Sequence, residues 1–192
     1  LNHFYERYQK GLSFSEAFEE LLHTYEANRP AYPINASFFT DFLQVKDRIV
    51  YKIINYKMNQ SLLQEIPHFR FLDLAIVFYC LLLADDTGNA SILIHDNHLK
   101  YWNVTPDELM TLAGKNTPNL LPYEVKNMHH ILSGELSIPT PDEYPMFVLT
   151  NTSRLNGAGC ILYKDLLKQI SDKLGSDFYI LPSSIHEVIL VP

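Results

Sequence analysis

The chain has 192 residues, of which 47% are hydrophobic and 19% are charged, a composition that excludes an intrinsically disordered protein. Asp and Glu total 22 against 15 Lys and Arg, so the formal net charge of −7 repels phosphate backbones and disfavours nucleic acid as a partner. A chain of this length buries roughly 70% of the surface that it exposes when unfolded. We therefore expect a single domain over residues 1–192, mainly helical over 1–66 and sheet-containing over 67–192.

The first third of the chain has the pattern of a helical region. Ser13 and Glu16 form a capping-box pattern, and apolar residues at helical spacing follow, so a helix with one face towards a core is predicted over residues 13–27. The other elements predicted here are a helix over residues 37–45, a strand over residues 49–54 and a helix capped by Asn55 and stopped by Pro67.

Beyond residue 66 the pattern changes to that of a sheet. Apolar runs over residues 71–83 and 91–94 flank the turn sequence of residues 85–89, which predicts a hairpin of central strands. Thr105 is followed by a proline and two acidic residues, so a helix is expected to begin there. Another helix is predicted over residues 123–132, between a proline and a glycine.

The last third of the chain adds a second hairpin. The prolines of residues 137–145 indicate an exposed connection. Apolar runs over residues 146–149 and 158–162 flank Asn156 and Gly157, which predicts the hairpin. The remaining predicted elements are a helix over residues 166–174 and strands over residues 178–181 and 188–191. Amino-terminal helices followed by a mixed or mainly antiparallel sheet with packed helices give an α+β fold class.

Two features bear on the compartment in which the chain works. Cys80 and Cys160 both lie in apolar runs, where a thiol behaves as a small buried hydrophobe, so a reducing, cytoplasmic setting is expected. The longest apolar segment, residues 72–84, is interrupted by Asp73 and is shorter than the ~20 residues that a membrane-spanning helix needs. No membrane span is therefore expected.

Three stretches carry a resemblance that covers nearly the whole chain. They are residues 45–52 (VKDRIVYK), residues 71–77 (FLDLAIV) and residues 175–187, which begin with Gly-Ser-Asp and end with Ser-Ser-Ile-His-Glu. In these stretches the chain resembles an uncharacterised bacterial family, domain of unknown function family 5688. The resemblance implies a cytoplasmic bacterial protein and a missing segment ahead of Asn2, but no activity, cofactor or catalytic residue.

Ser184, His186 and Glu187 form the densest group of chemically active side chains. On an extended strand Ser184 and His186 project from one face, which allows a hydrogen bond between a nucleophile and a base. A hydrolase with its site around these three residues is one hypothesis, although no Gly-x-Ser-x-Gly motif accompanies it. The alternative is structural: Pro182, Ser183 and Ser184 form a turn, and His186 satisfies its polar atoms locally.

His95 and His98, with Asp96 between them, are the candidate metal ligands, because imidazole and carboxylate groups bind zinc. His129 and His130 lie farther along the chain. No His-Glu-x-x-His or paired Cys-x-x-Cys motif accompanies them, so a surface loop is the alternative interpretation. The 7 glycines form no phosphate-binding loop or dinucleotide fingerprint, and neither a metal nor a cofactor is expected.

Asp73 lies within an apolar run, where burying an ionised carboxylate without a partner costs several kcal/mol. Arg48 and Arg70 are the candidate partners in a structural ion pair, which we favour over a catalytic acid because no second acid has a recognisable spacing. Trp102 and Tyr101 could anchor a partner, but burial in the core is the default expectation for such aromatic residues.

These patterns favour a non-enzymatic, cytoplasmic protein-interaction domain over the hydrolase. Apolar and aromatic residues are abundant, and no convincing catalytic constellation accompanies them. We expect contacts with a protein partner or self-association, and because the chain is acidic the partner should be basic or neutral.

Overall fold

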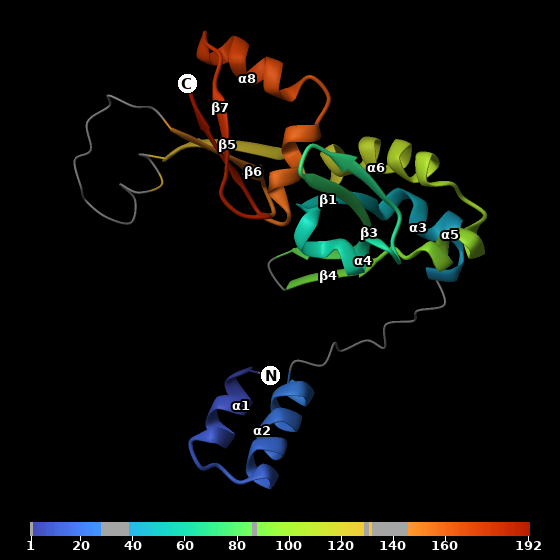
Figure 1. Cartoon of the computed structure of the whole chain (residues 1–192), viewed down its shortest axis with the longest axis vertical. Coiled ribbons are helices and arrows are strands. Elements are labelled where there is room, and N and C mark those ends of the chain that lie inside the picture. Colours follow the sequence, from blue (N-terminus) through green and yellow to red (C-terminus); the bar gives the residue numbers. More distant parts are fainter. Residues whose placement is uncertain (1, 28–38, 86–87, 129–130, 132–145) are drawn as a thin grey trace. The chain divides into compact units, whose positions relative to one another are not determined.

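The computed structural model describes residues 2–27, 39–85, 88–128, 131 and 146–192 (Figure 1). The chain divides into two compact units, an amino-terminal unit, Leu1–Ser37, and a carboxy-terminal unit, Phe38–Pro192. Helices and two antiparallel sheets together confirm the α+β class. The organisation of residues 1–192 as a single domain stays a prediction.

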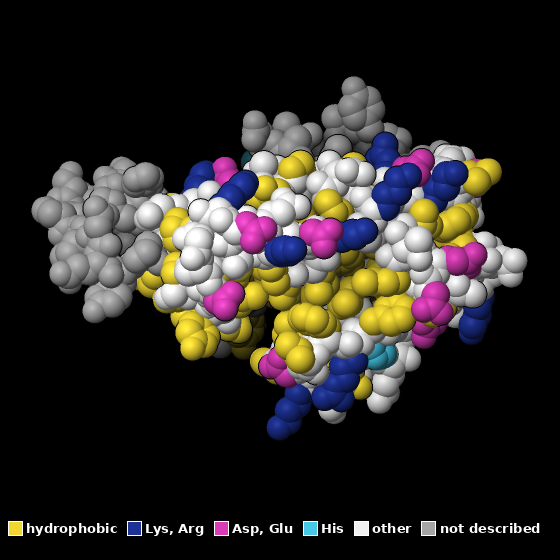
Figure 2. Space-filling model, turned by 90° about the horizontal axis from the view of Figure 1, so that it is seen from above, with side chains coloured by type: hydrophobic (Ala, Val, Ile, Leu, Met, Phe, Trp, Pro, Cys, Tyr) yellow, Lys and Arg dark blue, Asp and Glu magenta, His cyan; other side chains and the backbone are white. Residues whose placement is uncertain are grey.

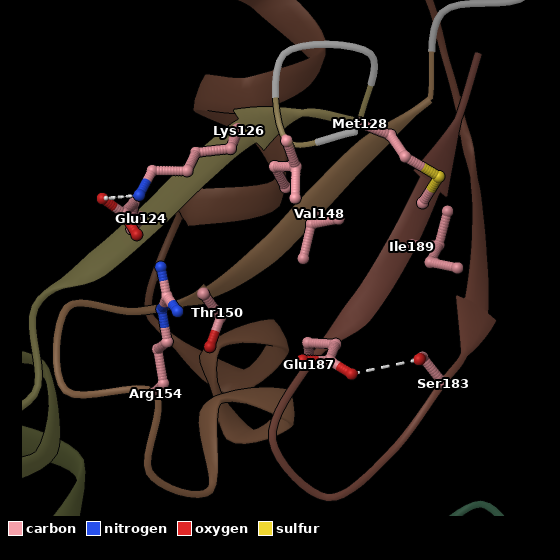
Figure 3. Close-up of a pocket in the computed structure, with 10 residues that line it drawn as sticks. Glu124, Lys126, Met128, Val148, Thr150, Arg154, Ser183, Glu187 and Ile189 are labelled. Atoms are coloured by element: carbon pink, nitrogen blue, oxygen red, sulfur yellow. Dashed lines mark hydrogen bonds and ion pairs between the residues drawn. The ribbon is translucent and has the colours of Figure 1, made fainter. Parts of the chain in front are cut away.

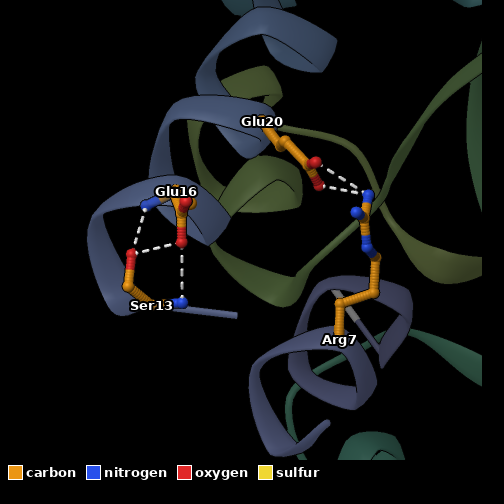
Figure 4. A network of polar contacts seen from close by, with 4 residues as sticks. All are labelled: Arg7, Ser13, Glu16 and Glu20. Carbon is orange, nitrogen blue, oxygen red and sulfur yellow. Dashed lines mark hydrogen bonds and ion pairs between the residues drawn. The ribbon is translucent and has the colours of Figure 1, made fainter. Parts of the chain in front are cut away.

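The amino-terminal unit is a pair of helices, α1 (Asn2–Gln9) and α2 (Phe14–Ala27). The capping box predicted at the start of α2 is confirmed: the Ser13 backbone N–H and hydroxyl group donate to Glu16 Oε2 at 3.0 and 2.6 Å (Figure 4). The two helices are joined by an ion pair between Arg7 and Glu20, whose charged atoms are 2.6 Å apart. Ala17 is the buried residue of α2.

The first sheet of the carboxy-terminal unit is built around β3 (Leu74–Asp85). β3 pairs antiparallel with β1 (Ile49–Asn55), β2 (His68–Phe71) and β4 (Gly88–Leu93). Residues 75–81 of β3 are all buried, because side chains on both faces of this strand pack in hydrophobic clusters. The β3–β4 hairpin and strand β1 confirm two predictions from the sequence.

Several helices accompany this sheet. They are α3 (Phe42–Val45), α4 (Gln60–Leu63), α5 (Asp96–Trp102), α6 (Pro106–Leu120) and the 3₁₀ helices η2 (Lys46–Arg48) and η3 (Lys57–Asn59). α6 begins at the predicted N-cap, where the Thr105 backbone N–H and hydroxyl group donate to Glu108 Oε2 at 2.8 and 2.9 Å. The helix packs against β1.

The second sheet has the strand order β5-β6-β8-β7 and is antiparallel throughout. Its strands are β5 (Tyr123–Asn127), β6 (Phe147–Asn151), β7 (Tyr179–Pro182) and β8 (Val188–Val191), and it is accompanied by η4 (Gly157–Leu162) and α8 (Leu166–Leu174). Leu149 and Leu190 of this sheet belong to the same buried cluster as Tyr51 and Phe78 of the first sheet. The two sheets therefore share one hydrophobic core.

Two predicted elements have a different secondary structure. Tyr123–Asn127 is a strand and not the start of a helix, because its backbone pairs with β6; residues 129, 130 and 132 of the predicted helix lie outside the described part of the chain. The segment after Asn156 is the 3₁₀ helix η4 and not a strand. Asn156 has a left-handed φ of 54°, and its carbonyl accepts the N–H of Gly159 at 3.1 Å, which coils the chain.

Other predictions at helix starts are confirmed in part. Of the helix predicted over residues 37–45 the structure forms α3, which begins after Asp41 because the Asp41 carboxylate accepts the N–H of Leu43 at 3.0 Å. Asn55 acts as the predicted cap, with Oδ1 accepting the N–H of Met58 at 2.9 Å. Residues 37 and 38 and the predicted connection over 137–145 lie outside the described residues.

The apolar run over residues 71–83 is not one continuous strand, because the chain turns at Leu72 and Asp73, between β2 and β3. Leu72 has a positive φ of 56°, and both side chains are exposed. The predicted burial of Asp73 is therefore wrong, and in the described structure neither Arg48 nor Arg70 forms an ion pair with it. Arg70 instead lies over the ring of Tyr56, 4.5 Å from its centroid. An exposed carboxylate is hydrated by water and needs no such partner.

Candidate functional site

The polar turn, residues 182–187, connects β7 to β8 and closes on its own polar groups. The hydroxyl groups of Ser183 and Ser184 both donate to Glu187 Oε1, at 3.2 and 3.1 Å. The backbone N–H of His186 donates to Ser184 Oγ at 2.9 Å, and the N–H of Ser184 donates to the Glu187 carbonyl at 3.2 Å. This geometry agrees with the predicted turn, but the ring of His186 bonds outside it, to Asn156, and not locally as the structural interpretation expects.

His186 links the polar turn to the segment that follows β6. Its Nδ1 atom accepts the backbone N–H of Asn156 at 3.2 Å, and its carbonyl oxygen accepts the Thr150 hydroxyl at 2.7 Å. Within the described structure the Ser184 and His186 side chains share no hydrogen bond, because the serine hydroxyl donates to Glu187. A serine nucleophile needs its base at about 2.6–3.2 Å. The described structure lacks this contact, and the hydrolase hypothesis stays a prediction.

Gly157 allows these two segments to approach closely. A Cβ atom at this position would collide with Thr150 Oγ1 and with the carbonyl oxygen of His186. The neighbouring Asn156 is buried and donates from Nδ2 to the hydroxyl group of Tyr79 on β3, at 3.1 Å. The junction beside the polar turn therefore connects the second sheet to the first.

A cavity of about 310 Å³ opens beside the polar turn (Figure 3). It lies on the face of the second sheet opposite the core, because its lining residues alternate along the strands with the core residues Val125, Leu149 and Leu190. We call it the sheet cavity. Its lining comprises Glu124, Lys126, Met128, Ile131, Val148, Thr150, Arg154, Ser183, Glu187 and Ile189. An apolar floor with a few charged groups around it is typical of a ligand-binding site.

The charged side chains of the sheet cavity comprise two of each sign. Lys126 Nζ lies 2.9 Å from Glu124 Oε1, two residues away on the same strand. The exposed Arg154 side chain makes no hydrogen bond or ion pair with the described residues. Glu187 accepts the two serine hydroxyls of the polar turn. An unpaired cation and an oriented anion therefore border the same cavity.

His95 and His98 lie at the start of α5, where their contacts are structural. His98 Nδ1 accepts the backbone N–H of His95 at 2.9 Å, and the His98 ring stacks on Trp102 with the centroids 5.7 Å apart. Burial and the neighbouring His95 lower the pKa of His98. Among the described residues no group of three or more His, Cys, Asp or Glu side chains could hold a metal ion, and residues 129 and 130 lie outside them.

The two aromatic residues predicted to be buried differ from each other. Trp102 is buried, as predicted, and its Nε1 donates to the carbonyl of Phe39 at 2.9 Å. The expected burial of Tyr101 is wrong, because this side chain is 82% exposed. Adjacent residues on a helix point about 100° apart, so one can face the core while the other faces solvent.

Cys80 and Cys160 are buried and free. Burial raises the pKa of each thiol to about 11, so the thiolate scarcely forms at neutral pH. Cys160 Sγ donates to the carbonyl of Thr150 at 3.3 Å. Tyr51 belongs to the same core, and its buried hydroxyl group has no hydrogen-bond partner among the described residues. Neither cysteine has the environment of a nucleophile.

Apart from Glu187, the sequence predictions did not include the charged residues of the sheet cavity, which are Glu124, Lys126 and Arg154. Glu124 and Lys126 alternate with Val125, whose side chain packs against the core, and this period of two is the signal of a half-buried strand. Arg154 has no comparable signal, because it lies in a turn whose position depends on the packing of distant strands.

A second surface with functional character lies on α2. Phe14, Phe18, Leu22 and Tyr25 are 72%, 48%, 43% and 63% exposed. Spacings of four, four and three residues place them on one side of the helix, and the rings of Phe14 and Phe18 stack with centroids 6.1 Å apart. We call these four residues the aromatic face. The predicted apolar stripe therefore exists, but most of it is exposed instead of facing a core.

The chain matches the family described as Family of unknown function (DUF5688) over residues 1–192 and belongs to this family. The resemblance noted in the sequence is confirmed. No curated protein and no solved structure matches the chain. None of the helices in the described ranges is long and apolar enough to cross a membrane.

Proposed function

We propose that this member of DUF5688 is a non-enzymatic protein-interaction domain, and that its contact surface is the aromatic face of α2. The observation that carries the proposal is the exposure of four large apolar side chains in one continuous stripe. Contiguous apolar surface of this kind is typical of a protein-binding site. Burying such a side chain contributes roughly 1.5–3 kcal/mol, so two or three of them supply useful affinity.

The charge beside the aromatic face favours one kind of partner. Glu19 and Glu26 are exposed and follow the stripe on one side of the helix, and α2 contains no Lys or Arg. On the other side α1 occupies the flank, where Arg7 pairs with Glu20. The partner we propose has an apolar groove bordered by Lys or Arg side chains. Self-association is less favoured, because it would bring the glutamates of two copies together.

The proposal includes a bacterial, cytoplasmic setting without nucleic acid as a partner. Two buried free thiols support a reducing compartment. On the face drawn in Figure 2, Lys and Arg side chains lie among Asp and Glu, whereas a nucleic-acid site typically has a basic stripe. The net charge of −7 supports the same conclusion.

Capture from a lysate of the source cell tests the proposal when it is made with matched variants. Phe18→Glu places a charge in the middle of the aromatic face, whereas Met58→Glu places one at an isolated residue that is 84% exposed in the other unit. We expect a protein that the wild type and Met58→Glu retain and Phe18→Glu loses. Calorimetry with the purified partner should then show weaker binding for Glu19→Lys and at higher salt.

Two results would contradict this function. One is the absence of any captured protein that depends on Phe18, and the other is a partner whose affinity is the same for all variants. Native mass spectrometry of the purified chain tests whether a second copy of the chain binds the aromatic face. A dimer that Phe18→Glu dissociates would replace the basic partner by a second copy of the chain.

A further inference from the structure

We propose that the sheet cavity binds a short apolar peptide with free ends, the peptide carboxylate at Arg154 and its ammonium group at Glu187. The site lies in the carboxy-terminal unit and is independent of the aromatic face. Its support comes from three features of the cavity, which are its floor, the turn that carries the cation and the turn that carries the anion.

The floor of the sheet cavity is apolar, although it lies on the solvent side of a sheet. Val148 of β6 and Ile189 of β8 are partners across the two strands, and the Met128 side chain extends towards Ile189 in Figure 3. A solvated sheet face typically carries polar residues at such positions. Partly buried apolar side chains here offer contact area to an apolar ligand.

Arg154 has a fixed backbone and an unpaired guanidinium group. Its N–H donates to the carbonyl of Asn151 at 2.9 Å, and its φ of 51° is left-handed, which residues other than glycine rarely adopt. Asn151 is 1% exposed and exchanges two side-chain hydrogen bonds with the backbone of Leu155, at 2.7 and 3.1 Å. This turn places a cation beside the cavity, and a guanidinium group matches a carboxylate in a bidentate pair.

Glu187 is the corresponding anion. The hydroxyl groups of Ser183 and Ser184 both donate to its Oε1 atom, which fixes the carboxylate and leaves Oε2 without a hydrogen bond from the described residues. An ammonium group donating to this carboxylate would form a charge-assisted hydrogen bond. The site therefore offers a partner to each end of a zwitterion.

The mixed charge of the cavity selects against simpler ligands. An anion alone would meet the carboxylates of Glu124 and Glu187, and a cation alone would meet Arg154 and Lys126. A peptide with free ends carries both charges and separates them by its length, at most about 3.3–3.6 Å per residue. A volume of about 310 Å³ restricts the ligand to a few small residues.

Calorimetric titration of the full chain with valine peptides of two, three and four residues tests this proposal. Each peptide is compared with the same peptide acetylated at its amino end or amidated at its carboxyl end. At the best-fitting length we expect each block to weaken binding about tenfold, because it removes one charged hydrogen-bonding group. This comparison needs no variant of the protein.

Variants then assign each end of the peptide to its residue. Arg154→Gln should bind free and amidated peptides equally, and should still discriminate against acetylation. Glu187→Gln, which keeps an oxygen for the two serines, should show the reverse. Lys168→Gln on the exposed side of α8 is the matched control, and Phe18→Glu should bind as wild type, which separates this site from the proposed function. Failure of every peptide to bind at millimolar concentration, or equal binding of free and blocked peptides, would overturn the proposal.

Discussion

The hydroxyl group of Thr117 on α6 accepts a hydrogen bond from the backbone N–H of Tyr51 on β1, at 3.1 Å, and donates to the carbonyl of Ala113 at 2.6 Å. The adjacent Asn116 donates from Nδ2 to the carbonyl of Ile49, at 3.0 Å. β1 is an edge strand of the first sheet, so these side chains satisfy backbone groups that would otherwise be unpaired. α6 therefore satisfies the free backbone groups of β1 with its side chains, in addition to packing against the strand.

Replacing Thr117 by Val should lower the free energy of unfolding by about 1–3 kcal/mol, because the buried N–H of Tyr51 loses its acceptor. Thr111→Val is the matched control in the same helix. The Thr111 hydroxyl donates to the carbonyl of Asp107 at 2.9 Å but is exposed, so the expected change is within about 0.5 kcal/mol. Urea unfolding followed by circular dichroism measures both values. Equal losses would show that the bond to β1 contributes nothing.

Gly157→Ala should destabilise the chain by about 1–3 kcal/mol, because the added Cβ atom meets Thr150 Oγ1 and the His186 carbonyl and must displace backbone. Gly114→Ala is the opposite control. Gly114 lies within α6 and an added Cβ meets nothing within 4 Å, so a gain of about 0.5–1 kcal/mol is expected from helix propensity. Thermal unfolding of both variants checks the signs. A neutral Gly157→Ala would mean that the junction beside the polar turn adjusts freely.

The sequence predicts correctly those elements whose signals are local. The capping boxes at Ser13 and Thr105 lie within four residues of the groups they satisfy, and both helices begin where predicted. β5 was predicted as a helix, since its partner β6 lies some twenty residues farther along and the intervening residues give no pairing signal. The segment after Asn156 was also predicted wrongly, as a strand. Its conformation depends on a distant contact, the hydrogen bond from the Ala158 N–H to the carbonyl of Ile185 in the polar turn.

One part of the candidate site could be predicted from the sequence and the other could not. The polar turn could be recognised because Ser183, Ser184 and Glu187 are close in sequence and bond to one another. The cavity beside it could not, because Lys126, Arg154 and Glu187 come together only when the second sheet forms. Chemically active residues were therefore found where they are neighbours along the chain, and missed where the fold assembles them.

Both native thiols should resist a disulfide reagent such as DTNB at pH 8. With a pKa of about 11 for Cys80 and Cys160, the thiolate fraction is lower than for an ordinary thiol by about two orders of magnitude, and burial limits access further. Met58→Cys adds an exposed thiol as the positive control. We expect one fast equivalent in this variant, none in the wild type and two in the unfolded wild type. Fast labelling of the native wild type would contradict the burial of these cysteines.

His98 should make the stability of the carboxy-terminal unit depend on pH. Its folded-state pKa lies below the ordinary value of 6.5, because burial disfavours the charged ring and the neighbouring His95 adds a like charge when protonated. Below pH 6.5 the unfolded chain therefore takes up the proton first, and the contribution of the neutral ring to stability, complete above that pH, is lost as the pH falls towards the folded-state value.

His98→Gln tests this pH dependence, because a glutamine oxygen can still accept the N–H of His95 but cannot titrate. The difference in unfolding free energy between wild type and His98→Gln, measured in urea, should shrink from pH 8 to pH 5. If the wild type instead keeps or increases its advantage in unfolding free energy over His98→Gln on acidification, the folded chain does not favour the neutral ring of His98.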